Sequence, residues 1–189
     1  MPGMVILGID PGLSSTGFGV IRKEGADLRP LEHGGIETPP GVALSLRLDK
    51  IYREVTAVIQ RHQPGVVVLE QLFFSSNAKS AMAVGEARGA IMLAAAHAGA
   101  EVAQYTPLEI KQALVGRGRA GKEQVSFMVQ SILGLGPIAS NHASDALAAA
   151  ICHAHRYELE ERVRGAKATG GTPLVPRSAA GRRKTKRPG

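Results

Sequence analysis

The sequence predicts a mixed α/β fold in which one five-stranded sheet carries helices on both faces. Three β-type segments come first, and helical and β-type segments then alternate. Val66–Glu70 is a continuous apolar run ending on a carboxylate, which is typical of a central parallel strand covered on both faces. A long amphipathic segment precedes this run and supplies the helix of a right-handed crossover from the first strand.

The first three strands are predicted to form an antiparallel meander, which Pro39, Pro40 and Gly41 bring to an end. The other two strands follow helices and are expected to run parallel to the first. The five predicted strands are Met4–Asp10, Gly17–Lys23, Leu31–Thr38, Val66–Glu70 and Glu101–Tyr105.

Five helices are predicted where apolar residues recur at helical spacing. Thr106 is the expected N-cap of the third helix, and Pro107 suits its first turn. Gly85 and Gly89 lie about one turn apart in the second helix and leave room for another backbone, either of the sheet or of a second subunit. The five helices are Ala43–Gln63, Asn77–Gly99, Leu108–Val115, Lys122–Leu133 and Ser140–Glu161.

Positive charge is concentrated at the C-terminal end. The 189 residues carry a net charge of +7, and eight Lys or Arg with no acidic residue lie between Arg164 and Gly189, which leaves 7 − 8 = −1 on residues 1–163. We expect one folded domain over residues 1–162 and a basic, disordered tail over residues 163–189. Any site for a polyanion on the folded domain must therefore be a local patch.

Cys152 is the only cysteine, so an intramolecular disulfide is excluded, as suits a reducing cytosol. The N-terminus shows no signal segment, and the apolar run Ala90–Ala98 is too short to span a bilayer. These features predict a cytoplasmic protein without a membrane partner. Five residues are assigned to the core or surface with no chemical role: His97, Tyr105, Cys152, His153 and His155.

Two of the predicted parallel strands end on carboxylates, at Asp10 and Glu70. Taken alone, Asp10 before Pro11 and Gly12 is better explained as the start of a turn or as a helix cap. If the two strands are neighbours, however, both carboxylates lie at the same edge of the sheet. Two carboxylates about 4 Å apart repel by about 4 kcal/mol at a partly screened dielectric, so a cation is expected between them.

His142 and Asp145 are three residues apart at the start of the last predicted helix and share the face that points toward the sheet. With Asp10 and Glu70 they predict a catalytic site for two divalent ions that hydrolyses a phosphodiester. Carboxylates suit Mg²⁺, whereas an imidazole ligand favours Mn²⁺. His142 is interpreted as a ligand, as a proton shuttle, or as a residue that caps the helix or supports a ligand.

A local basic patch follows the third predicted helix, with no acidic residue from Lys111 to Lys122. It is expected to contact nucleic-acid phosphates. The patch consists of Lys111, Arg117, Arg119 and Lys122.

Phe73 and Phe74 follow the strand that ends at Glu70. At least one of them either stacks on an unpaired base or covers the neighbouring helix. Lys79 and Arg88 either contact phosphate or belong to a solvated helix face.

These blocks resemble the RuvC family of Holliday-junction resolvases over Met4–Tyr157. The resemblance rests on Gly8–Gly12, Glu70-Gln71 followed by Phe73, Gly85–Gly89, Tyr105–Pro107 with Ile110–Gln112, and Asp145–Ala148. It implies a ribonuclease-H-like fold and a homodimer that nicks a four-way DNA junction symmetrically, leaving 5′-phosphate and 3′-hydroxyl ends. The RuvA and RuvB branch-migration proteins are the implied partners.

By motif position, the resemblance implies that Asp10, Glu70 and Asp145 bind the metal ions. His142 stands where many members carry a further Asp. Phosphate contact is implied for Lys111 and Lys122, and base stacking for Phe73.

Two other classes of function share part of this pattern. An actin-like or sugar-kinase-like phosphotransferase begins with a similar strand and phosphate-binding loop, but it needs two such domains, which about 160 ordered residues do not supply. A junction-binding protein without catalysis would rely on the Lys111–Lys122 patch and the tail. The acidic set argues against it.

Overall fold

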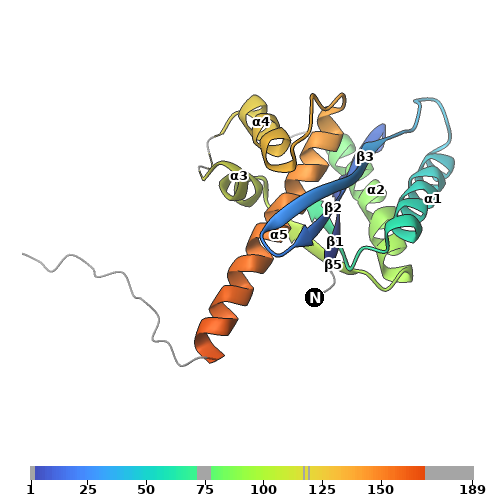
Figure 1. The fold of residues 1–189 in the computed structure, drawn as a ribbon. Coiled ribbons are helices and arrows are strands. Elements are labelled where there is room, and N and C mark those ends of the chain that lie inside the picture. The colour runs from blue at the N-terminus through green and yellow to red at the C-terminus, as the bar shows by residue number, and fades with distance from the viewer. Residues whose placement is uncertain (1–2, 72–77, 117, 119, 169–189) are drawn as a thin grey trace, which may run out of the picture.

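The computed structural model describes residues 3–71, 78–116, 118 and 120–168. The described residues form five strands and five helices (Figure 1). The strands are β1 (Met4–Asp10), β2 (Ser15–Glu24), β3 (Asp27–Glu37), β4 (Val66–Glu70) and β5 (Glu101–Tyr105). The helices are α1 (Leu44–His62), α2 (Ala78–His97), α3 (Pro107–Val115), α4 (Lys122–Leu133) and α5 (Asn141–Ala168). In the described part of the chain, no helix combines the length and the apolar character needed to cross a bilayer.

The five strands form one sheet in the order β3-β2-β1-β4-β5. The pairs β1–β2 and β2–β3 are antiparallel, and the pairs β1–β4 and β4–β5 are parallel. This confirms the predicted meander followed by two parallel strands. It also makes β1 and β4 direct neighbours, with Ile9 opposite Leu69.

Helices cover both faces of the sheet, as predicted (Figure 1). One face packs on α1 and α2 through a core that includes Leu7, Ile9 and Leu69. The opposite face packs on α3, α4 and α5 through a core that includes Ile6 and Val68. Alternate residues of each central strand thus face different helical layers, as expected for strands buried on both faces.

The hairpin of β2 and β3 is longer than predicted. The prediction ended one strand at Lys23 and began the next at Leu31, whereas the structure pairs Glu24 with Asp27 around a tight turn. Gly25 adopts a φ of 60° in this turn, a conformation that glycine allows at little cost. Pro30 is accommodated because β3 is an edge strand.

The last helix is also longer than predicted. It continues from the expected end at Glu161 to Ala168, so the first residues of the predicted disordered tail, 163–168, are helical. Arg, Lys and Ala residues in this segment are strong helix formers, which outweighs the single Gly165. Residues 169–189 lie outside the described residues.

The first turns of α5 lie directly on β1 and β2 because glycines face the helix there. A Cβ atom added to Gly8 would be 2.0 Å from the carbonyl oxygen of Ala146, and one added to Gly17 would be 2.0 Å from that of His142. No side chain fits between the helix backbone and the strands at these two points. This close contact determines how near the side chains of α5 come to the end of β1.

Gly8→Ala is expected to destabilise the protein by about 2 kcal/mol or more, because the new methyl group must displace the α5 backbone. Gly65→Ala is the matched control, since a Cβ atom there meets nothing within 4 Å. Urea unfolding of both variants measures the difference. Equal stability of the two variants would contradict the proposed packing constraint.

Candidate active site

Asp10 and Glu70 lie side by side at one edge of the sheet. They end the parallel neighbours β1 and β4, one residue after the pair Ile9–Leu69. Strand alternation turns Glu70 to the same face as Val68, toward the layer of α3, α4 and α5. The predicted juxtaposition of these two carboxylates is therefore found.

The start of α5 brings two more functional groups to the same edge. His142 Nδ1 lies 2.7 Å from Asp10 Oδ2. Asp145 lies one turn further along α5, and its Oδ2 forms an ion pair with Lys122 Nζ at 2.9 Å. Four predicted site residues thus form one group, which we call the carboxylate cluster: Asp10, Glu70, His142 and Asp145.

The carboxylates of this cluster affect one another electrostatically. Burial raises the pKa of Asp10, and the nearby Asp145 raises it further, against the lowering effect of the His142 hydrogen bond. Burial also raises the pKa of Glu70, and the charges of Asp10 and Asp145 add to this effect. The ionised cluster is therefore costly in the protein alone and favours the binding of positive charge.

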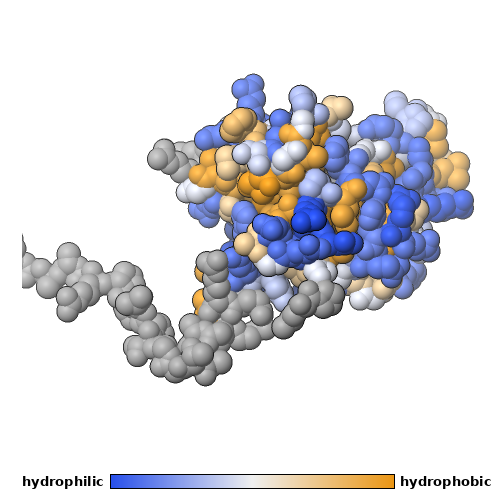
Figure 2. Space-filling model, in the orientation of Figure 1, coloured by the Kyte–Doolittle hydropathy of each residue, from blue (hydrophilic) through white to orange (hydrophobic). Residues whose placement is uncertain are grey.

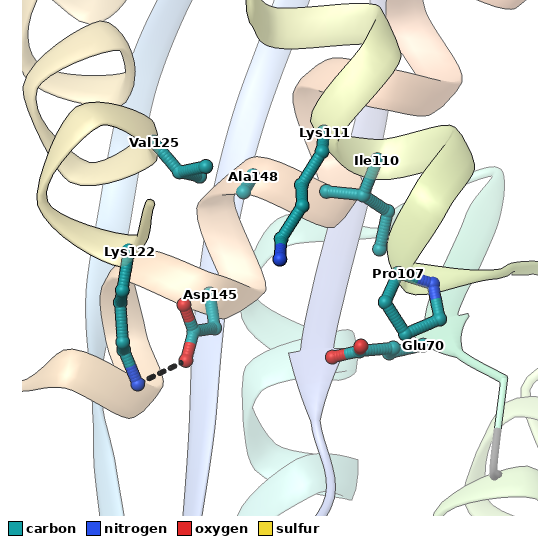
Figure 3. Close-up of a pocket in the computed structure, with 8 residues that line it drawn as sticks. All are labelled: Glu70, Pro107, Ile110, Lys111, Lys122, Val125, Asp145 and Ala148. Carbon is teal, nitrogen blue, oxygen red and sulfur yellow. Dashed lines mark ion pairs between the residues drawn. The ribbon is translucent and has the colours of Figure 1, made fainter. Parts of the chain in front are cut away.

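Two lysines supply part of that positive charge. Hydrogen bonding to Asp145 is the main cause of a raised pKa at Lys122. Lys111 lies close enough to lower the pKa of Glu70. Both lysines line a pocket of about 210 Å³ above the carboxylates, which Figure 3 shows. The lining residues are Glu70, Pro107, Ile110, Lys111, Lys122, Val125, Asp145 and Ala148.

The start of α3 is held by local hydrogen bonds, which position Lys111 one turn later. Thr106 is the N-cap, as predicted, and forms a capping box with Glu109. The Glu109 backbone N–H donates to Thr106 Oγ1 at 3.2 Å, and the Thr106 N–H donates to Glu109 Oε2 at 2.8 Å. A capped short helix gives Lys111 a defined place beside the pocket.

The cluster fits a divalent metal by the chemistry of its donors, although its side chains are not arranged as a finished metal site. Among the described residues, no group of three His, Cys, Asp or Glu side chains is gathered closely enough to hold a metal. The carboxylates are nevertheless close enough that the charge of Asp145 raises the pKa values of Asp10 and Glu70. His142 adds an imidazole beside Asp10. Carboxylate oxygens with one imidazole are suitable ligands for Mg²⁺ or Mn²⁺.

The family model described as "Crossover junction endodeoxyribonuclease RuvC" matches residues 6–153 of this chain. The chain belongs to the RuvC family. This confirms the family predicted from the sequence blocks. The RuvC of Rubrobacter xylanophilus is 49% identical over 156 residues, which cover 82% of this chain and 87% of that relative. The RuvC of Pelotomaculum thermopropionicum is 46% identical over 162 residues, which cover 85% of this chain and 99% of that relative.

Solved structures confirm the predicted ribonuclease-H-like fold. The T. thermophilus RuvC in complex with a Holliday-junction substrate has a TM-score of 0.80 and 40% identity, covering 83% of this chain and 96% of that one. The yeast mitochondrial Holliday junction resolvase Ydc2 has a TM-score of 0.64 at 11% identity, covering 89% and 87% of the two chains. The second likeness concerns the fold alone.

Arg88 was expected either to contact phosphate or to lie on a solvated helix face, and the structure shows neither position. Its side chain is only 7% exposed, so it is neither on a solvated helix face nor available at the surface for a phosphate. The guanidinium donates one hydrogen bond to the backbone carbonyl of Glu70 and another, 2.7 Å long, to Gln104 Oε1. Arg88 in this RuvC-family chain therefore ties α2 to the end of β4, directly behind Glu70.

A sequence signal for this role exists in the neighbours of Arg88. Ala87 and Gly89 flank it on a helix rich in alanine, and Ala87 is fully buried. Because Arg88 is buried next to Ala87, its charged side chain needs polar partners inside the protein. The backbone carbonyl at the end of β4 is a partner that no sequence pattern could indicate.

Five predicted DNA contacts fall on parts of the chain that the structure does not describe. Phe73, Phe74, Arg117 and Arg119 lie outside the described residues, and so does the side chain of Lys79. Their roles stay predictions.

The residues to which no chemical role was assigned have structural partners. Tyr105 Oη lies 2.8 Å from His153 Nδ1, and His97 Nδ1 lies 2.9 Å from Tyr52 Oη. His155 Nδ1 lies 3.1 Å from the carbonyl oxygen of Ala113. Cys152 is buried, and burial raises the pKa of its thiol to about 11. None of these residues lines the pocket at the carboxylate cluster.

Asp10→Asn is expected to raise the free energy of unfolding of the metal-free protein at neutral pH, because it removes one of three mutually repelling carboxylates. The folded-state pKa of Asp10 lies above its ordinary value of 3.8. The unfavourable contribution is therefore absent below that value and complete above the raised one. Urea unfolding across a pH series should show a gain that disappears as the pH falls below about 3.8.

Mg²⁺ provides the internal control for this measurement. It should stabilise the unsubstituted protein more than the variant, because binding to the folded state adds to stability by mass action. A variant that is no more stable at any pH would contradict the electrostatic account of the cluster.

Proposed function

We propose that this RuvC-family chain resolves four-way DNA junctions as a metal-dependent endonuclease, with Asp10, Glu70, His142 and Asp145 as its catalytic residues. The observation that carries the proposal is the carboxylate cluster beside Lys111 and Lys122. Acids whose charge is unfavourable in the protein alone lie next to lysines able to receive a phosphate. A phosphodiester and divalent cations together complement this arrangement.

We propose Mg²⁺ or Mn²⁺ as the cofactor, with two ions in each site held by the carboxylate cluster. When bound, such ions supply a water activated as the nucleophile and neutralise charge on the scissile phosphate. His142 is either one of the ligands or a proton shuttle, and its contact with Asp10 supports both roles. The presence of an imidazole among the carboxylates favours Mn²⁺.

The lysines of the pocket are proposed to orient the DNA backbone. Lys111 lies on the Glu70 side of the pocket and Lys122 on the Asp145 side, so that a phosphate between them would face the acids (Figure 3). Phe73, Phe74, Lys79, Arg117 and Arg119 remain proposed DNA contacts. Arg88 is proposed to act indirectly, through its hydrogen bond to the Glu70 carbonyl.

The rival functions fit less well. The described residues form a single five-stranded sheet, whereas a phosphotransferase of the actin or sugar-kinase type clamps its nucleotide between two domains. A junction-binding protein without catalysis would have no use for three carboxylates that repel both one another and the DNA.

We also propose a homodimer, formed through one face of α2. An added Cβ at Gly85 or Gly89 meets nothing within 4 Å, so in the described structure these glycines do not accommodate the sheet. Met82 is 65% exposed and Leu93 is 50% exposed on the same helical face. An apolar stripe with two small residues suits close packing against a second copy of the helix. By the family resemblance, RuvA and RuvB are proposed as partners and the cytoplasm as the location.

Asp10→Asn should lower the cleavage rate by about a thousandfold, or about 4 kcal/mol of transition-state stabilisation, because one metal-binding carboxylate is lost. Junction binding should be unchanged or tighter, since a negative charge facing the DNA is removed. A mobile four-way junction incubated with a series of divalent metals, followed by a denaturing gel, measures cleavage. Gel-shift titration without metal measures binding.

Asp49→Asn is the matched control, because Asp49 lies on α1 and pairs only with Arg53 among the contacts of the described residues. It should cut at the rate of the unsubstituted protein. An Asp10→Asn variant that cuts at that same rate would overturn the catalytic assignment. Binding by the unsubstituted protein without cleavage in any metal would favour the non-catalytic rival.

Leu93→Glu should convert the proposed dimer to monomers, because it places a charge on the apolar face of α2. Leu46→Glu is the control, since Leu46 is similarly exposed on α1. Analytical ultracentrifugation distinguishes the two outcomes. Equal molecular masses for both variants would exclude α2 as the dimer contact.

A further inference from the structure

A second groove lies next to the active site, between the outer face of α4 and the start of α5. Its volume is about 530 Å³, and Lys122 lines both this groove and the pocket at the carboxylate cluster. Asn141, which also lines the groove, directly precedes His142 of the cluster. We call it the α4 groove. Its lining residues are Lys122, Glu123, Ser126, Phe127, Gln130 and Asn141.

The α4 groove holds an exposed aromatic ring. Phe127 is 67% exposed, while Val125 and Val129 on the other side of α4 are buried in the core. The whole chain contains only four phenylalanines and no tryptophan. Figure 2 shows hydrophobic residues reaching the surface in the area over α3 and α4. The ring of Phe127 offers a flat apolar face that folding of the described chain does not use.

The polar groups of the groove suit a nucleotide base better than a phosphate. Gln130 and Asn141 carry amides, which both donate and accept hydrogen bonds and match the edges of bases. Glu123 places a carboxylate in the groove, which repels a phosphate. The cation, Lys122, lies at the end shared with the active site, where it pairs with Asp145. Lys122 therefore favours the DNA backbone at the carboxylate cluster, and Glu123 with the two amides favours a base along α4.

We propose that the α4 groove binds one base of the DNA strand next to the cleaved phosphate. The base stacks on Phe127, and its edge is read by Gln130 or Asn141, so that the groove contributes to the choice of the nicked sequence. The inference rests on the proposed endonuclease function and adds to it a subsite for specificity. A stacked base next to the scissile phosphate would also fix the register of the strand.

The test compares Phe127→Ala with Phe127→Tyr, which keeps the stacking ring, and with Leu46→Ala, an exposed site on α1 at the opposite face of the sheet. Cleavage is measured on four-way junctions that differ in single base pairs on either side of the nick. Phe127→Ala should reduce the rate ratio between preferred and disfavoured sequences by about tenfold, in line with the loss of one base–aromatic stack. Phe127→Tyr and Leu46→Ala should keep the ratio.

A second readout does not depend on cleavage. 2-Aminopurine is placed at each of the positions around the nick, and its fluorescence is followed on binding with Ca²⁺ in place of Mg²⁺. Stacking on Phe127 should quench the probe at one position for the unsubstituted protein and for Phe127→Tyr, and not for Phe127→Ala. Thermal unfolding of Phe127→Ala should match that of the unsubstituted protein, because the ring is exposed.

The outcomes separate this inference from the proposed function. If the unsubstituted protein neither cuts nor binds junctions, the proposed function fails. If it cuts with a sequence preference that Phe127→Ala leaves intact, and no probe changes its quenching, the α4 groove does not bind a base and the inference fails alone. An Asn141→Ala or Gln130→Ala variant that changes the preferred base identifies which amide reads it.

Discussion

The repulsion among three carboxylates at one edge of the sheet is the constraint on which this structure depends. Asp10 and Glu70 are brought together by the parallel pairing of β1 and β4, and Asp145 joins them from α5. Burial makes the ionised carboxylates less favourable, and this is the main reason that the pKa values of Asp10 and Glu70 are raised. Such a site favours the binding of divalent cations, because a bound cation offsets the repulsion among the ionised carboxylates.

The rest of the fold maintains that arrangement. Gly8 and Gly17 let α5 approach the strands more closely than any side chain would permit, which holds His142 and Asp145 beside Asp10. Arg88 fixes the backbone at Glu70 from the other helical layer. Lys122 offsets the charge of Asp145 and marks the boundary between the pocket at the acids and the α4 groove. The carboxylate cluster and its two lysines thus come from five elements: β1, β4, α3, α4 and α5.

Local sequence patterns identified most elements because their causes are local. The β-branched run of β4 and the Thr106 capping box depend on nearby residues alone, and both were found as predicted. The length of the β2–β3 hairpin was underestimated because the Gly25 turn and the exposed edge strand produce little hydrophobic alternation. The end of α5 was missed because the same basic residues that suggest disorder also favour a helix.

The sequence by itself determined which residues could carry the chemistry, since Asp10, Glu70, His142 and Asp145 are recognisable from their positions at strand ends and on one helical face. It also determined the family, through blocks of residues in a fixed order. Only the tertiary structure decided the partners: Asp10 with His142, Lys122 with Asp145, and Arg88 with the Glu70 backbone. The physical reason is that these contacts join residues far apart in the chain, and their distances depend on how strands and helices pack, which no local pattern encodes.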